Sequence, residues 1–258
     1  MSTDKLSKEF YRKNAEFYAA HVRDPKNSVY HAYYEKPAMY SLLPDLKGKM
    51  ALSLGCGSGE DSTYLKKQGA LESIGIDLSP ELISIAEKSY PESKFKVMDM
   101  EKLDFPNASF DFVYSSLAIH YVEDWSVVFN EVFRILKPGS KFLFSCGNHI
   151  KMCMEGPDDG EYSTKKLEVI KKNSTGELTI TGDYLTKKKN MNVFGRDTVN
   201  MWSMSVSDIS KALKESGFLI EQIVEPRPLE ELKDIEPMTY LRLNKVPEFI
   251  IFKVIKSS

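Results

Sequence analysis

Three glycines at alternate positions follow an apolar, strand-like run in the segment ALSLGCGSGE, residues 51–60: they are Gly55, Gly57 and Gly59. Eighteen residues beyond Gly59, a second short apolar run, SIGID, ends in Asp77. Glycine lets a chain turn sharply from a buried strand into a helix and lets a ligand lie against the main chain. A carboxylate at the tip of the next strand can accept two charge-assisted hydrogen bonds from a ribose diol. This pattern predicts a nucleotide-type cofactor site with Asp77 on the ribose.

The elements that must position these residues alternate between strands and helices. Ser79 suits a helix N-cap and Pro80 a first helical position, so a helix is expected directly after Asp77. A third strand ending near Asp99, a fourth strand beginning at Phe110, a helix over residues 125–136 and a fifth strand, KFLFS, follow in order. The series predicts an α/β protein with a Rossmann-like, doubly wound sheet.

The glycine turn alone does not define the cofactor, because dinucleotide oxidoreductases also use one. Their fingerprint is G-x-G-x-x-G, whereas the third glycine here falls one residue early. The second mononucleotide-binding half of those enzymes is also missing from the chain. Both features disfavour a nicotinamide oxidoreductase.

Four motifs in order, LGCGSG, GIDLSPELI, DMEKLDFPNASFDFVYSS and LKPGSKFLFS, resemble those of class I S-adenosylmethionine-dependent methyltransferases of the type 11 kind. The resemblance extends less specifically over the rest of the chain, which is similar to bacterial-type small-molecule methyltransferases. It implies a seven-stranded, mostly parallel sheet with an inserted cap and an N-terminal lid helix. It also implies S-adenosylmethionine as the cofactor, with S-adenosylhomocysteine as the product.

The resemblance assigns cofactor contacts residue by residue. It places the glycine turn with Cys56 on the methionine and ribose side, Asp77 on the ribose hydroxyls and Leu78 beside the adenine. The remaining positions are Asp99 and Met100 flanking the adenine amino group, Ser115 near the methionine, and Tyr11 and Tyr18 on the lid helix. Ser53 stands where the family commonly has Asp near the cofactor's ammonium. Either Glu60 or Asp61 then compensates for the lost charge, or cofactor affinity is lower.

The chain is expected to form a single methyltransferase domain over residues 1–258. Its parts are a lid at 1–35, a core at 36–146 and 205–258, and a substrate-cap insertion at 147–204, where the strand–helix alternation lapses. His120, just past the fourth strand, lies where open parallel sheets place their ligand crevice, and it is the candidate base if the acceptor needs one. The candidate substrate contacts are Tyr30, His149, Tyr184 and Trp202.

Composition narrows the classes of acceptor. A net charge of −2 and a pI near 6.2 provide no global attraction for polyanions. The turn after the fourth strand reads SSLA rather than the N/D-P-P-Y/F of nucleic-acid amino methyltransferases. A small-molecule acceptor is therefore expected and nucleic acid is unlikely, with an RNA methyltransferase or a non-catalytic cofactor-binding protein as alternatives. Oligomeric state and the choice among O-, N- and C-methylation stay open.

Cysteine usage and the absence of targeting features indicate the cellular compartment in which the protein is expected. The three cysteines, Cys56, Cys146 and Cys153, have no metal-ligand spacing, so no metal is expected, and their odd number disfavours a disulfide framework. The polar start, MSTDKLSKEF, lacks the apolar core of a signal peptide, and no run approaches the length of a membrane span. We expect a cytoplasmic protein that does not insert into membranes.

Overall fold

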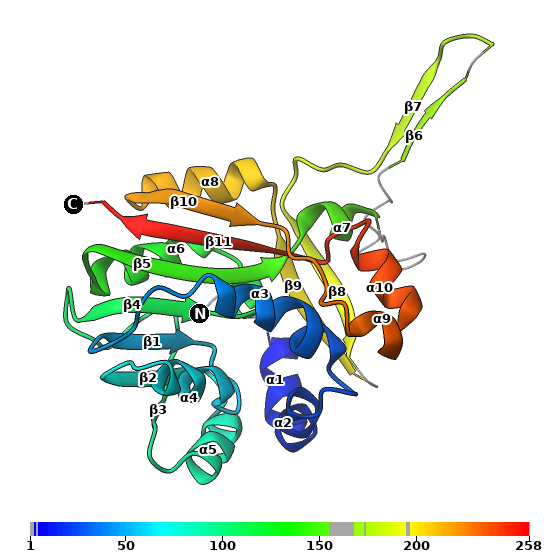
Figure 1. The fold of residues 1–258 in the computed structure, drawn as a ribbon. Helices are drawn as coiled ribbons and strands as arrows, with labels where there is room; N and C mark the ends of the chain where they lie inside the picture. The colour runs from blue at the N-terminus through cyan, green and yellow to red at the C-terminus, as the bar shows by residue number, and fades with distance from the viewer. Residues whose placement is uncertain (1–2, 4, 155–167, 173, 195–196, 258) are drawn as a thin grey trace.

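A seven-stranded sheet forms the centre of the computed structural model, which describes residues 3, 5–154, 168–172, 174–194 and 197–257. The strand order is β10-β11-β5-β4-β1-β2-β3 (Figure 1). Strand β11 runs antiparallel to both of its neighbours, and the other described pairs in this sheet are parallel. The predicted doubly wound, mostly parallel architecture is confirmed. The strands are β1 (Met50–Leu54), β2 (Glu72–Asp77), β3 (Lys94–Val97), β4 (Phe110–Ser115), β5 (Leu136–Gly147), β10 (Phe218–Val224) and β11 (Phe249–Lys256).

Helices cover both faces of the sheet because its central strands are apolar on both sides. Along β1, Ala51 packs into one cluster with residues of α3 and α4, whereas Leu52 and Leu54 pack into another with residues of α6 and α8. The period of two along a strand sends neighbouring side chains to opposite layers. The helices that cover the two faces of the sheet are α3 (Lys36–Ser41), α4 (Glu60–Lys67), α5 (Pro80–Ser89), α6 (Trp125–Ile135) and α8 (Val206–Glu215).

Side-chain caps fix where the helices begin. Ser79 Oγ accepts the backbone N–H of Leu82 at 3.2 Å and Pro80 opens α5, as the sequence predicts. Ser205 Oγ likewise accepts the N–H of Asp208 at 3.2 Å at the start of α8. The cap of α5 ties this helix to the end of β2, where Asp77 stands.

The chain before β1 forms more than one lid helix. Helices α1 (Lys5–Lys13) and α2 (Ala15–Arg23) are followed by η1 (His31–Glu35), a single π-helical turn that leads into α3. Between β10 and β11 the chain passes through a coil segment with Pro226 and Pro228 and then forms two short helices. The structure has α9 (Leu232–Ile235) and α10 (Pro237–Leu243) there, and Pro237 opens α10 because its fixed φ suits a first helical turn.

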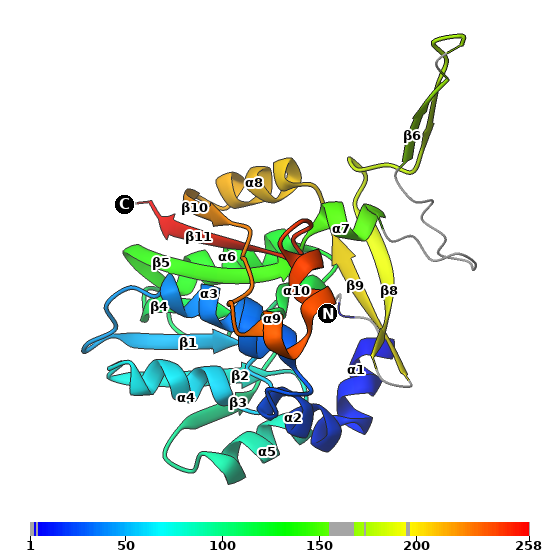
Figure 2. The same ribbon diagram turned by 45° about the vertical axis from the view of Figure 1, so that its right-hand side comes forward.

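Two hairpins and a short helix occupy the described part of residues 147–204, the expected cap. They are α7 (His149–Met154), the pair β6 (Glu168–Lys171) with β7 (Leu178–Thr181), and the pair β8 (Lys188–Phe194) with β9 (Asp197–Ser203). The β6–β7 hairpin projects away from the rest of the molecule (Figures 1 and 2). Residues 155–167 of the expected cap lie outside the described residues. Strand β9 packs on α1, where Ser7 Oγ donates to Asn200 O and accepts from Asn200 N, both at 3.1 Å.

None of the helices within the described ranges has the length and apolar character needed to cross a membrane.

Candidate cofactor site

A cavity of about 330 Å³ lies at the carboxyl ends of β1, β2 and β4. Because β2 and β4 flank β1 on opposite sides, this is the switch point where open α/β sheets bind ligands. Side chains of α1 and α2 roof the cavity. Its lining residues are Thr3, Ser7, Lys8, Tyr11, Arg12, Tyr18, Gly55, Gly57, Asp77, Leu78, Ser79, Pro80, Glu81, Leu82, Met100, Ser116, Leu117, Ala118, Tyr121 and Val122.

The glycine turn allows two close approaches. At Gly55, where φ is +62°, an added Cβ would lie 2.4 Å from the Cβ of Ala118 in the segment after β4. At Gly59, where φ is +96°, it would lie 2.8 Å from the ring of Phe95. Gly55 and Gly57 line the cavity, whereas Gly59 packs behind the turn and Cys56 is buried without lining it.

Asp77 joins the glycine turn to the start of α5. Its Oδ2 accepts the N–H of Gly57 and its Oδ1 accepts the N–H of Ser79, both at 2.9 Å. Burial raises the pKa of the Asp77 carboxyl, and these backbone hydrogen bonds act against that shift. Each carboxylate oxygen retains acceptor capacity at the cavity wall.

Leu78 and Met100 give the cavity an apolar wall beside Asp77. Asp99 does not line the cavity, and its Oδ1 accepts the N–H of Glu101 at 3.0 Å. Ser115 is fully buried, and its hydroxyl donates to Leu54 O at 3.2 Å. The cavity is lined instead by the next residue, Ser116, because the side chain of the last strand residue points into the sheet packing.

Three tyrosines from separate segments meet in the cavity wall. Tyr11 and Tyr121 share a hydrogen bond between their hydroxyls at 2.6 Å, and the ring of Tyr11 meets those of Tyr18 and Tyr121 edge-on. Burial raises the pKa of all three phenols, that of Tyr121 to about 12, so they are neutral at pH 7. The resemblance implies Tyr11 and Tyr18 but not Tyr121, which lies in a single 3-10 turn, η2 (Ile119–Tyr121), and has no periodic pattern around it.

His120 lies behind the cavity rather than on its lining. The side chain is 3% exposed, and its Nδ1 accepts the N–H of Gly147 at 3.3 Å. Nε2 therefore carries the ring proton in the neutral form, and it has no hydrogen-bond partner among the described residues. Burial lowers the pKa of His120 to about 3, so the ring is neutral at pH 7.

None of the four predicted substrate contacts lines the cavity. The Tyr30 hydroxyl accepts a hydrogen bond from Arg242, and its ring packs on Phe249. The side chain of His149 contacts Tyr184, with 2.7 Å from its Nε2 to the Tyr184 carbonyl oxygen. Trp202 lies on β9 with the ammonium groups of two lysines over its ring, Lys187 at 4.9 Å and Lys189 at 5.6 Å.

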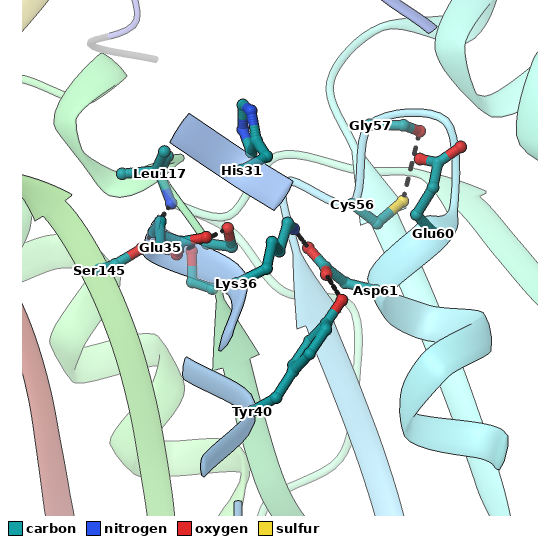
Figure 3. A network of polar contacts seen from close by, with 12 residues as sticks. His31, Glu35, Lys36, Tyr40, Cys56, Gly57, Glu60, Asp61, Leu117 and Ser145 are labelled. Atoms are coloured by element: carbon teal, nitrogen blue, oxygen red, sulfur yellow. Dashed lines mark hydrogen bonds and ion pairs between the residues drawn. The ribbon is translucent and has the colours of Figure 1, made fainter. Parts of the chain in front are cut away.

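Both carboxylates that were candidates to compensate for Ser53 have other partners, and those of Asp61 are seen in Figure 3. Glu60 Oε1 accepts from Arg23 Nε at 2.6 Å. Asp61 forms an ion pair with Lys36 and accepts the Tyr40 hydroxyl at 2.9 Å. Neither Glu60 nor Asp61 lines the cavity.

A glycine turn after the first strand, an acid at the tip of the adjacent strand and a cavity at the switch point together define a nucleoside-binding α/β protein. A family profile described as a methyltransferase domain matches residues 52–144. The crystal structure of an S-adenosylmethionine-dependent methyltransferase from Mesorhizobium loti matches with a TM-score of 0.69 and 28% identity, covering 86% of this chain and 97% of that one.

Two curated relatives extend the comparison. An uncharacterized protein from Haemophilus influenzae is 30% identical over 230 residues, which are 82% of this chain and 87% of the relative. Phosphoethanolamine N-methyltransferase 3 from Arabidopsis thaliana is 35% identical over 106 residues, which are 39% of this chain but only 22% of that protein. This chain belongs to the class I S-adenosylmethionine-dependent methyltransferases, and S-adenosylmethionine is its cofactor.

Proposed function

We propose that the protein transfers the methyl group of S-adenosylmethionine to a small-molecule acceptor. The observation that carries this proposal is the cavity at the ends of β1, β2 and β4, which α1 and α2 partly cover. Its volume of about 330 Å³ falls in the range of small-molecule sites. A net charge of −2 and a relative named for phosphoethanolamine support a small acceptor over a polyanion.

The residues of the cavity fit the cofactor. Asp77 is proposed to bind the ribose hydroxyls, since both of its oxygens are held at the wall by backbone N–H groups. Gly55 and Gly57 leave room for the chain that extends from the ribose, and Leu78 and Met100 supply apolar surface for the adenine. Tyr11 and Tyr18 close the cavity from the lid and keep water out.

The bound cofactor supplies a methyl group that is already activated on a sulfonium. The protein therefore mainly aligns the acceptor and excludes water, a contribution of several kcal/mol. His120 remains a proposed base, although its Nδ1 lone pair is occupied by the Gly147 N–H. For this role the ring must first release Gly147 and turn toward the acceptor. We predict that His120→Ala slows turnover while cofactor binding is retained; unchanged turnover on the true acceptor would remove His120 from the mechanism.

The proposed function is tested by incubating the protein with methyl-labelled S-adenosylmethionine and a cell metabolite extract, with total RNA as a parallel sample. Label in a small product supports the proposal. Label in RNA instead indicates an RNA methyltransferase. Tight cofactor binding without label in either sample indicates a non-catalytic cofactor-binding protein.

A further inference from the structure

A buried carboxylate stands directly behind the cavity wall. Glu35, the last residue of the π-helical turn η1, is fully buried, and its Oε1 accepts the hydroxyls of Ser116 at 2.9 Å and Ser145 at 2.5 Å (Figure 3). Its Oε2 has no hydrogen-bond partner among the described residues. The adjacent Lys36 directs its ammonium to Asp61. The negative charge of Glu35 therefore has no ion pair of its own among the salt bridges within the described ranges.

This carboxylate sets the shape of the segment after β4. Ser145 Oγ, while donating to Glu35, accepts the N–H of Leu117 at 3.0 Å. Leu117 has a φ of +49°, a left-handed conformation that costs a branched residue free energy and needs support from its surroundings. Ser116 and Leu117 both line the cavity, so Glu35 holds that part of the wall in place.

The hydrogen bond to Glu35 also determines what Ser116 can bind. A serine hydroxyl has one proton, and that of Ser116 is donated to Glu35. Toward the cavity, Ser116 Oγ can therefore only accept a hydrogen bond. The group that meets it must be a donor, and the buried charge behind it favours a cation.

The order of the strands indicates which part of the cofactor reaches Ser116. Asp77 ends β2, Gly55 follows β1 and Ser116 follows β4, and these strands are neighbours in the order β2, β1, β4. Neighbouring strands lie about 4.8 Å apart, so Ser116 is roughly 10 Å across the sheet from Asp77. A cofactor with its ribose on Asp77 and its 5′ arm over Gly55 brings its amino-acid end to Ser116. Among the lining residues the carboxylates are Asp77 and Glu81, both on the β2–α5 side of the cavity.

We propose that Ser116, backed by Glu35, binds the α-ammonium of S-adenosylmethionine. Ser116 makes the contact, and Glu35 is a positioning residue that orients the hydroxyl and supplies the charge. The pair would do the work of the carboxylate that Ser53 does not provide. This inference rests on the cofactor and on the ribose contact proposed for Asp77, and it is independent of the acceptor.

Calorimetry with two ligands tests the proposal without knowledge of the acceptor. S-adenosylhomocysteine carries the ammonium, whereas 5′-methylthioadenosine shares its nucleoside but has no amino acid. We expect Glu35→Gln and Ser116→Ala to weaken S-adenosylhomocysteine binding about tenfold and to change 5′-methylthioadenosine binding less than about twofold. Ser73→Ala removes a hydroxyl from a buried position on β2 that is remote from this contact, and we expect it to leave both affinities unchanged.

The pH dependence of binding separates charge from packing. Burial raises the pKa of Glu35, and a bound ammonium favours its ionised form. Affinity for S-adenosylhomocysteine should therefore rise with pH through the Glu35 titration in the wild type and not in Glu35→Gln. Titration of Asp77 affects the affinities for both ligands alike. Comparing the pH profile for S-adenosylhomocysteine with that for 5′-methylthioadenosine therefore removes the contribution of Asp77. The other titratable groups around Glu35 are Lys36, Tyr40, Asp61 and Tyr114.

Two results would overturn the inference. One is wild-type affinity for S-adenosylhomocysteine in both variants. The other is an equal loss for both ligands, which would show that the pair is only structural. If Glu35→Gln does not fold, the binding result for Ser116→Ala, a substitution at a partly exposed position, decides the test. Normal binding results without any methyl transfer would sink the proposed function and leave this inference standing.

Discussion

Replacing Asp77 by asparagine removes the charge at the centre of the proposed ribose contact while nearly preserving shape. The wild-type carboxylate accepts two backbone N–H groups at 2.9 Å, and we propose that it also accepts the two ribose hydroxyls. Hydrogen bonds to a charged group contribute about 1.5–3 kcal/mol each, and the amide offers only one oxygen. We expect a loss of about 2–4 kcal/mol in cofactor binding, which is roughly 30- to 1,000-fold in Kd.

The assay is calorimetric titration with S-adenosylmethionine, accompanied by thermal unfolding of the free variant. Unfolding matters because the asparagine amide would face the N–H of either Gly57 or Ser79, which destabilises the turn itself. Asp104→Asn, which removes the same charge from an exposed loop position, serves as the control. A folded Asp77→Asn protein that binds S-adenosylmethionine within about threefold of the wild type would refute the reasoning about the ribose.

Two further substitutions probe the turn and the buried histidine. Gly55→Ala should cost about 2–5 kcal/mol of unfolding free energy, because φ is +62° and the new Cβ would lie 2.4 Å from that of Ala118. Gly48→Ala serves as the control, because Gly48 has a φ of +72° with open space around it, and it should cost only the backbone strain of about 1–2 kcal/mol. Equal losses of unfolding free energy for the two variants in denaturant melts would contradict the steric argument. The pKa of about 3 at His120 lies below that of the unfolded chain, so its contribution to stability is present above pH 6.5 and lost as pH falls toward 3. His120→Ala should therefore reduce the slope of stability against pH in that window by about 1.4 kcal/mol per pH unit, and an unchanged slope in acid-unfolding titrations would show that the ring is not buried neutral.

The parts of the site that follow a strand directly could be predicted from the sequence. A strand, a glycine turn and a capped helix are local patterns, and they bring Gly55, Gly57, Asp77 and Leu78 to one edge of a parallel sheet. Met100, Tyr11 and Tyr18 also line the cavity, as the resemblance implies. The glycines, Asp77 and Leu78 follow core strands directly, whereas Tyr11 lies on α1, a helix that also packs on β9 of the cap.

Other residues of the candidate site lie on irregular backbone, which leaves no periodic pattern in the sequence. Tyr121 enters through a 3-10 turn, and Glu35 enters through a π-helical turn. The predicted substrate contacts fail to reach the cavity for a different reason. His149, Tyr184 and Trp202 depend on how the inserted segment packs, and long-range packing of this kind cannot be derived from hydrophobic spacing alone. Tyr30, which precedes η1, instead contacts Arg242 and Phe249 near the end of the chain. His149 and Tyr184 do meet, but they contact each other rather than the cavity.

The contact between α1 and β9 has a consequence for how ligands come and go. Ser7, whose hydroxyl donates to and accepts from the Asn200 backbone, also lines the cavity. The helix that covers the cavity is therefore hydrogen-bonded to a hairpin almost two hundred positions later in the chain. Lifting the helix alone breaks both hydrogen bonds and uncovers its packed side. Any exchange of the methyl donor that lifts α1 must therefore either break these contacts or displace helix and hairpin together.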